Sequence, residues 1–224
     1  PHLSSSLWSF SDYASHRISK GPEGTIIVGT GNGSLYQFGS KGELKQFWES
    51  PFQSEIEFLH YEDVEQRLIS SHGIINFKSK SFKPLRLGKS LFIDQRNNLG
   101  LNTYNQTILL SSDLSSVPKL PKELTLRNPP LYSRQKAPYY QLLGKRSMCG
   151  LFAPFAQAYF IGAADGLYKV KLAENSSIEN LRYLNEEVFA NHLYNRGDEI
   201  LVSTKGNGLL LLRGDSLYSF FDDS

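Results

Sequence analysis

The chain has 224 residues, 40% of them hydrophobic and 21% charged, and 24 Lys and Arg residues against 22 Asp and Glu residues give a net charge of +2. This length allows one or two domains with a sizeable core, and the balanced charge argues against a nucleic-acid-binding protein. No apolar run approaches the roughly 18 residues of a membrane-spanning helix, and no secretory signal is visible. The single cysteine, Cys149, excludes an internal disulfide and a zinc site built from cysteines.

In chain order, the first predicted strand is the short alternating run at 6–10, and a polar connector follows at 13–23. Residues 26–38 indicate a strand, a tight turn and a second strand, because apolar runs flank the sequence Gly-Thr-Gly-Asn-Gly. A fourth strand is predicted at 43–48, and Pro51 ends the unit. This unit of four strands is the pattern that the rest of the chain repeats.

The same order of strand, hairpin and strand returns four more times before the C-terminus. Residues 113–145 are the least regular part and hold five prolines. We interpret them as the outer strand of the third unit plus a long insertion, with a linker between two domains or a degenerate sixth unit as alternatives. No stretch has a convincing helical period, and 178–189 is the best candidate for a helix. The predicted units of one domain, 1–224, are 6–50, 54–86, 89–145, 146–185 and 188–221.

The spacing of the units predicts an all-β fold, a β-propeller built of four-stranded blades. Leu68 lies 41 residues after Ile27, and Val202 lies 41 residues after Ile161. A repeat of about 40–45 residues with four strands is typical of a propeller blade, and packing blades around an axis buries sheet faces that one sheet alone leaves open. About five blades are recognisable, either a complete small propeller or part of a six- or seven-bladed one.

The hairpin turns of three units contain Asn-Gly or Asp-Gly, at Gly33, Gly166 and Gly208. Such turns need a positive φ, which glycine supplies at little cost. The sequence around Gly29 and Gly33 superficially suggests a nucleotide loop, but a strand follows it where a dinucleotide site needs a helix. The lipase-like run Gly-Asp-Ser-Leu at 214–217 is interpreted as chance, since no histidine follows it.

Three stretches, 24–38, 158–170 and 198–209, resemble the propeller repeat of bacterial two-component regulators, in which Gly-Thr precedes a glycine-rich turn and an apolar strand. The resemblance implies a periplasmic or extracellular sensor domain of a membrane-anchored hybrid two-component protein, a family that often senses carbohydrate. The chain departs from the repeat where the family often has tryptophan, since Ile27, Ile69, Phe160 and Leu201 stand there. Kinase and DNA-binding parts are outside these residues.

In a propeller, the first strands of the blades line the central channel, and loops at one end form a concave face where ligands bind by default. Candidate ligand-binding residues therefore lie in or just before the predicted first strands or in the irregular stretch, where aromatic and cationic groups suit a sugar or a peptide. The alternative is that the aromatic side chains pack between blades and the charges are solvated. The candidates are Trp8, Glu55, Glu57, His60, Lys89, Asp94, Arg146, Asn191, His192, Tyr132, Arg134, Tyr139 and Tyr140.

These observations leave three classes of function. The first is a ligand-sensing extracytoplasmic domain that binds a small molecule or oligosaccharide, and the second is a protein-interaction scaffold that binds a neighbouring propeller or a second protomer. The third, a glycosidase, needs two carboxylates about 5–10 Å apart, and Asp12, Glu57 and Asp94 fall at unlike positions of their strands. We therefore expect no enzyme activity in this region and no cofactor. We also expect no metal, because the five histidines lack paired spacing.

Overall fold

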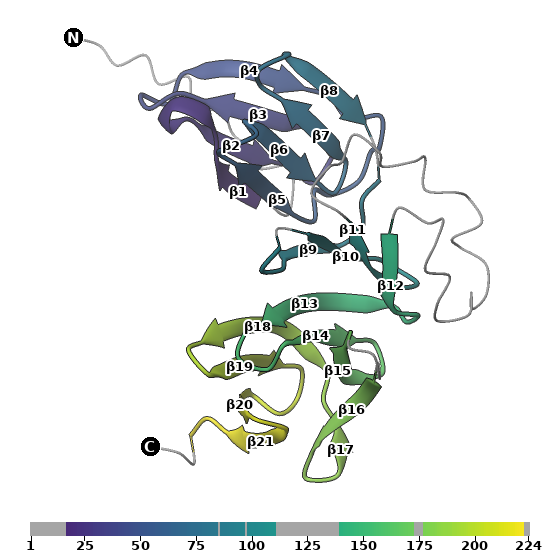
Figure 1. Ribbon diagram of the computed structural model, residues 1–224. Coiled ribbons are helices and arrows are strands. Elements are labelled where there is room, and N and C mark those ends of the chain that lie inside the picture. The colour runs from purple at the N-terminus through teal and green to yellow at the C-terminus, as the bar shows by residue number, and fades with distance from the viewer. Residues whose placement is uncertain (1–16, 85, 97, 111–138, 173–176, 222–224) are drawn as a thin grey trace. The chain divides into compact units, whose positions relative to one another are not determined.

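The structure is a computed structural model that describes residues 17–84, 86–96, 98–110, 139–172 and 177–221. These residues form antiparallel β-sheets and one short 3₁₀ turn, η1 (Pro22–Gly24), with no α-helix among them (Figure 1). The predicted all-β class is confirmed. No helix in these ranges has the length and apolar character of a transmembrane span. The chain divides into two compact units, Pro1–Leu87 and Gly88–Ser224, and each is described by itself.

Unit 1 holds two four-stranded sheets, and each runs as a meander in which every strand pairs with the next along the chain. The strands of the first sheet are β1 (Arg17–Lys20), β2 (Ile26–Gly29), β3 (Leu35–Phe38) and β4 (Leu44–Trp48). The strands of the second sheet are β5 (Leu59–Glu62), β6 (Arg67–Ser70), β7 (Gly73–Asn76) and β8 (Ser81–Pro84). The first strands of the two sheets, β1 and β5, lie against each other.

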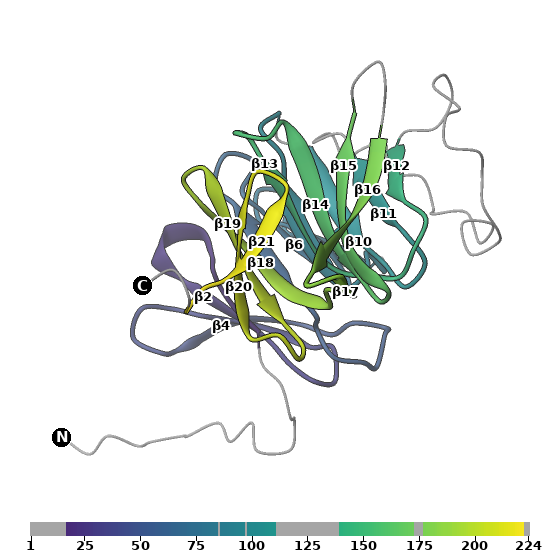
Figure 2. The same ribbon diagram turned by 90° about the horizontal axis from the view of Figure 1, so that it is seen from below.

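Unit 2 holds three sheets of the same kind, two with four strands and one with five (Figure 2). The strands of the third sheet are β9 (Ser90–Ile93), β10 (Leu99–Asn102), β11 (Thr107–Leu110) and β12 (Tyr139–Leu143). Those of the fourth are β13 (Ser147–Ala153), β14 (Ala158–Ala163), β15 (Gly166–Lys171), β16 (Ser177–Tyr183) and β17 (Glu186–Glu187). Those of the fifth are β18 (Ala190–Arg196), β19 (Glu199–Thr204), β20 (Leu209–Arg213) and β21 (Ser216–Ser219). The first strands again lie side by side, β9 against β13 and β13 against β18.

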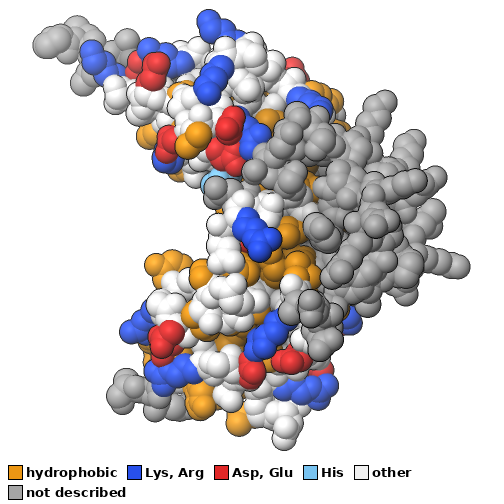
Figure 3. Space-filling view, in the orientation of Figure 1, with side chains coloured by type: hydrophobic (Ala, Val, Ile, Leu, Met, Phe, Trp, Pro, Cys, Tyr) orange, Lys and Arg blue, Asp and Glu red, His pale blue; other side chains and the backbone are white. Residues whose placement is uncertain are grey.

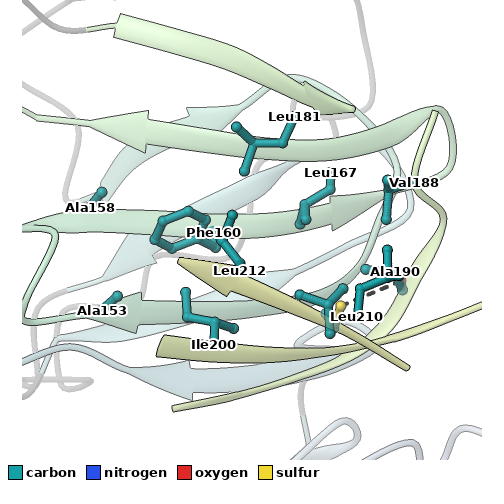
Figure 4. Close-up of a cluster of buried hydrophobic side chains, with 12 residues drawn as sticks. Ala153, Ala158, Phe160, Leu167, Leu181, Val188, Ala190, Ile200, Leu210 and Leu212 are labelled. Carbon is teal, nitrogen blue, oxygen red and sulfur yellow. Dashed lines mark hydrogen bonds between the residues drawn. The ribbon is translucent and has the colours of Figure 1, made fainter. Parts of the chain in front are cut away.

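The cores of both units lie between successive sheets. Between the fourth and fifth sheets, Phe160 and Leu167 meet Val202, Leu210 and Leu212, and all five side chains are buried (Figure 4). Full burial of a large apolar side chain stabilises the fold by about 1.5–3 kcal/mol. Each sheet therefore depends on its neighbour for a large part of its stability.

The 41-residue spacing has a different structural meaning in the two units. Ile161 faces the third sheet and Val202 faces the fourth, so both point toward the preceding sheet and are equivalent. Ile27 and Leu68 instead belong to one cluster and point toward each other from facing sheets. A shift of one residue along a strand turns a side chain to the other face. The structural counterpart of Leu68 in the first sheet is therefore Val28, one residue from the position that the sequence predicts.

The glycines of the three hairpin turns have the predicted positive φ, 88° at Gly33, 149° at Gly166 and 70° at Gly208. In the first and fifth sheets, a threonine begins the turn and its backbone N–H donates across the loop, from Thr30 to Ser34 and from Thr204 to Gly208, at 3.0 Å in each case. Both turns lead directly into strands, so the hairpin interpretation is confirmed over a nucleotide loop. The Gly-Asp-Ser-Leu run forms the turn before β21 and the start of that strand.

The first strand of the first sheet corrects the prediction. The run at 6–10 lies outside the described residues, and β1 instead lies within the stretch predicted as a polar connector, 13–23. Its sequence, Arg-Ile-Ser-Lys, has one apolar residue, Ile18, and that side chain is 71% exposed. Hydrophobic alternation cannot reveal such a strand, because its backbone pairing with β2 holds it in place and its side chains are not buried.

Two further predictions are decided by the strand pairing. Residues 178–189, the best candidate for a helix in a chain without a convincing helical period, belong to β16, β17 and the short segment that follows them. The outer strand predicted within 113–145 is confirmed, because β12 pairs with β11 and completes the third sheet. The remainder of the predicted insertion, 113–138, lies outside the described residues. The described residues form five sheets.

Candidate functional site

Two of the predicted ligand-binding residues, Lys89 and Arg146, meet at one end of unit 2. Both lie just before a first strand, β9 or β13, at the end of the sheets where the hairpins between second and third strands turn. The Lys89 Nζ atom lies 4.2 Å from the ring centroid of Tyr104, and the Arg146 guanidinium carbon lies 5.9 Å from the same centroid. We call Lys89, Tyr104 and Arg146 the basic–aromatic cluster.

Sequence reasoning missed the aromatic member of this cluster. Tyr104 stands in the turn between β10 and β11, next to Asn105, where a polar turn residue is unremarkable. Its side chain is 58% exposed, so the ring is open to solvent beside the two cations. The strand topology could have indicated Tyr104. In a meander of four strands, the turn between the second and third strands lies at the same end of the sheet as the connector to the next sheet.

A chain of polar side chains lies beneath the cluster. Asn102, Thr107 and Ser147 are fully buried. The Thr107 hydroxyl lies 2.8 Å from both Asn102 Oδ1 and Ser147 Oγ, and the Asn102 amide donates to the Ser90 hydroxyl at 2.8 Å. Buried polar groups whose hydrogen bonds are all made rigidify a core and specify one arrangement of its strands. The network therefore fixes the third sheet against the fourth directly under the basic–aromatic cluster.

Backbone hydrogen bonds fix the positions of the two cationic residues in the same way. The Lys89 N–H donates to the Asn102 carbonyl at 2.7 Å, and the Arg146 carbonyl accepts from the Ala164 N–H at 2.9 Å. The Ser147 N–H donates to the Thr103 carbonyl at 3.1 Å, which ties the start of β13 to the loop that carries Tyr104. The cluster consequently stands on ordered backbone from two sheets.

A third cation lies next to the cluster but has a partner of its own. Lys145 forms an ion pair with Asp165, and its ammonium lies 5.0 Å from the ring centroid of Tyr168. The hydrogen bond to Asp165, and then the one to Tyr168, raise the pKa of Lys145 above its ordinary value. Neither Lys89 nor Arg146 forms an ion pair with a carboxylate in the part of the chain that the structure describes. The cluster thus carries two positive charges that no described acid neutralises.

The other predicted residues with described side chains do not join this cluster. In unit 1, Glu55 lies 3.8 Å from Arg17 in an exposed ion pair. His60 lies in β5 and is half-buried, and this burial lowers its pKa. Asn191 and His192 are exposed at the start of β18, where the strand has a bulge between Ala190 and His192.

Five predicted residues give little or no structural information. Trp8, Tyr132 and Arg134 lie outside the described residues. Tyr139 and Tyr140 pair through their backbones with Leu110 and Leu109, and their side chains are outside the description.

Asp94 has a structural role that its position at the end of a strand did not reveal. It is buried, and its carboxylate accepts from the Arg96 and Asn98 backbone N–H groups, the Asn98 amide and the Tyr159 hydroxyl, at 2.8–2.9 Å. Burial alone would raise the pKa of Asp94, but these hydrogen bonds outweigh it and hold the pKa below the ordinary value. The residue closes the turn after β9. Glu57 lies in unit 1 and donates its backbone N–H to Ser71, and Asp12 lies outside the described residues.

A second pairing of a cation with aromatic groups lies at the same end of the sheets in unit 1. The Arg86 guanidinium carbon lies 5.1 Å from the Phe52 ring centroid, and the Phe52 ring meets the His72 ring edge to face at 5.6 Å. His72 is buried, and its Nε2 atom lies 3.1 Å from the Ser54 hydroxyl. Burial lowers the pKa of His72. These contacts fasten the connector before β5 to the hairpin turn of the second sheet.

Cys149 is a buried side chain in β13. Its thiol donates to the Ala190 carbonyl at 3.5 Å, and burial raises the pKa of the thiol to about 12. A thiol with such a pKa is a poor nucleophile at neutral pH. Across the described ranges, no three His, Cys, Asp or Glu side chains gather as a metal site would require. On the face in view in Figure 3, the blue and red side chains are interspersed and do not gather into a patch of one sign.

Comparison with known proteins shows the fold of the chain. No protein-family profile and no curated protein sequence matches it. Among solved structures, it is similar to PorZ, a bacterial surface component of the type-IX secretion system of Porphyromonas gingivalis, with a TM-score of 0.62 and 14% identity over 95% of this chain and 34% of that chain. It is also similar to the extracellular domain of the putative hybrid two-component system BT4673 of B. thetaiotaomicron, with a TM-score of 0.61 and 13% identity over 93% of this chain and 28% of that chain. The chain thus spans about a third of the length of the first and just over a quarter of the length of the second.

Proposed function

We propose that the chain is a run of β-propeller blades that serves as the extracytoplasmic, ligand-sensing part of a bacterial signal-transduction protein. The observation that carries this proposal is the likeness, over 95% and 93% of the chain, to a bacterial surface protein and to the extracellular domain of a hybrid two-component system. The repeat resemblance of residues 24–38 and 198–209 supports the same class. An extracytoplasmic sensor needs no catalytic groups of its own.

The propeller part of the proposal rests on how the sheets stack. In each unit, the first strands of successive sheets lie side by side and the apolar faces pack between them. Blades arranged around an axis have this arrangement, because the inner strands converge while the outer strands diverge.

One face of the first sheet indicates that the series of blades continues. Ile26 and Phe47 lie on the face opposite the one that packs on the second sheet, and their side chains are 47% and 46% exposed. The counterpart of Ile26 in the fourth sheet, by pairing register, is Tyr159, which is buried among side chains of the third sheet. An apolar face of this kind is normally covered in a soluble protein. We therefore propose that a further sheet of the same repeat covers this face in the whole protein.

The ligand that suits the proposed sensor is a carbohydrate at the basic–aromatic cluster. Aromatic rings offer an apolar face to a sugar ring, and charged groups at its edge orient the hydroxyl groups by hydrogen bonds. Tyr104 supplies the ring, and Lys89 and Arg146 supply the donors. Of the candidate residues predicted from the sequence, this proposal keeps Lys89 and Arg146, and it adds Tyr104.

A protein-interaction scaffold is the second candidate, and the apolar face of the first sheet favours it. In that function, the surface at Ile26 and Phe47 receives a partner protein and no small ligand is involved. Binding of a saccharide to the purified chain would argue against this candidate.

Two measurements test the proposed function. The first inserts a reporter that is active only outside the cytoplasm directly after residue 224 of the whole protein. Reporter activity shows in which compartment the chain lies, and we expect the reporter to be active. A thermal-shift screen of the chain with oligosaccharides is expected to show a raised melting temperature for at least one, because a ligand that binds only the folded state stabilises it. A cytoplasmic reporter together with no saccharide response would overturn the proposal.

A further inference from the structure

We propose that the basic–aromatic cluster binds the acidic group of an anionic saccharide, a carboxylate or a sulfate, and that neutral sugars bind it weakly. This inference rests on the proposed function for the saccharide part of the ligand. The anionic part rests on the charges and contacts of the described residues alone.

The first argument is electrostatic. Lys89 and Arg146 hold two positive charges within 6 Å of one ring centroid, and like charges at close range repel. The Tyr104 ring attracts each cation only weakly at an exposed site. An anion bound at the cluster would offset the repulsion and accept charge-assisted hydrogen bonds, which are about twice as strong as neutral ones.

The second argument is the contrast with the neighbouring lysine. Lys145 precedes Arg146 directly, and Asp165 neutralises it in an ion pair. The chain therefore provides a carboxylate for Lys145 and, within the described ranges, none for Lys89 or Arg146. An exogenous acid is the partner that completes this set of charges.

The third argument is that the site is already built before a ligand arrives. The buried network of Asn102, Thr107 and Ser147 holds the third and fourth sheets together below the cluster. Groups that are fixed in advance lose less conformational entropy on binding, which raises affinity. Charged side chains that are only solvated at a surface do not require a buried polar network beneath them.

The test is isothermal titration calorimetry on the 224-residue chain with three probes of matched length. These are trigalacturonate, which carries carboxylates, a sulfated galactose trisaccharide and neutral galactotriose. We expect one or both acidic probes to bind at least about tenfold more tightly than galactotriose, and the stronger of the two identifies the acidic group. The affinity is also expected to fall as salt rises, because screening weakens exposed charge pairs.

Variants assign the binding to the cluster. Lys89→Gln and Arg146→Gln are each expected to weaken the acidic probe by about tenfold or more, as the loss of a charged hydrogen bond predicts. Lys205→Gln removes an exposed lysine from another hairpin turn at the same end of the sheets and serves as the control, with unchanged affinity. Unchanged circular dichroism and melting temperature show that the variants fold.

The outcomes separate this inference from the proposed function. If galactotriose binds as well as the acidic probes and the two cluster variants bind normally, the inference is overturned while a saccharide sensor stands. If Lys89→Gln, Arg146→Gln and Lys205→Gln all lose the same affinity for the acidic probe, the effect comes from the net charge of the chain, and the inference is overturned as well. If no probe binds, the inference fails, and the compartment measurement then decides on the proposed function by itself.

Discussion

Replacement of Asp94 is the perturbation whose effect the structure defines most closely. Its carboxylate accepts four hydrogen bonds from three residues, Arg96, Asn98 and Tyr159. Asp94→Ala removes both acceptor oxygens and all four hydrogen bonds, and it leaves the Tyr159 hydroxyl buried without this partner. Asp94→Asn keeps one acceptor oxygen and replaces the other with a donor, so it removes the charge with little change of shape.

The expected magnitude follows from the surroundings of the four donors. A hydrogen bond to a charged group contributes about 1.5–3 kcal/mol, and a buried group left unsatisfied costs about 1–3 kcal/mol. The backbone donors of Arg96 and Asn98 lie in a turn where water can replace the carboxylate, whereas the Tyr159 hydroxyl is buried. We therefore expect Asp94→Ala to lower the free energy of unfolding by roughly 3–4 kcal/mol and Tyr159→Phe by roughly 1.5–2 kcal/mol.

The pH dependence of stability gives a second readout of the same residue. The pKa of Asp94 in the folded chain lies below its ordinary value of 3.8. Its contribution to stability is therefore fully present above that ordinary value and is lost as the pH falls through the folded pKa. The difference in unfolding free energy between the native chain and Asp94→Asn is expected to be constant from pH 7 to about pH 5 and to shrink below about pH 4.

Urea denaturation followed by far-ultraviolet circular dichroism measures these differences, and a double-mutant cycle of Asp94→Ala with Tyr159→Phe measures their coupling. The reasoning is refuted if Asp94→Ala changes the free energy of unfolding by less than about 0.5 kcal/mol, the range of ordinary surface substitutions. A difference that persists unchanged at pH 3 would also contradict it. Loss of a glycoside-cleaving activity in Asp94→Asn, with stability intact, would revive the glycosidase hypothesis.

Two further predictions concern packing between and within sheets. Gly100→Ala places a Cβ atom 2.1 Å from the Phe92 ring, so thermal melting should show a loss of roughly 1–3 kcal/mol, and adding Phe92→Leu should recover part of it. Asp215→Asn leaves the buried Lys169 ammonium without its carboxylate and should cost roughly 1–2 kcal/mol, whereas Lys169→Leu, which copies Leu211 of the fifth sheet, should be close to neutral. A larger loss for Lys169→Leu than for Asp215→Asn would contradict this account of the pair.

The sequence predicts the hairpins of this fold better than its edges. Gly33, Gly166 and Gly208 are recognisable because turn chemistry is local and needs no knowledge of the rest of the chain. The strand β1 is not recognisable, since it is an exposed edge strand whose single apolar residue, Ile18, points to solvent. A strand that is held only by backbone pairing has no alternating hydrophobic pattern in its sequence.

The candidate site was predictable in part. Lys89 and Arg146 could be chosen because residues before the first strands gather at one end of a meander. Tyr104 could not, because its role depends on two cations from other turns of two sheets. The buried Asn102 and Thr107 also escape prediction, since polar residues inside a strand look like interruptions until a neighbouring sheet supplies their partners.

The stacking of four-stranded sheets into a continuing propeller is the central claim, and oxidative footprinting tests it most directly. Hydroxyl radicals label exposed aromatic side chains, and Phe47, on the apolar face of the first sheet, is 46% exposed. We predict that Phe47 is labelled in the isolated 224-residue chain and protected in the whole protein, where a further sheet covers it. Equal labelling of Phe47 in both proteins would contradict the claim.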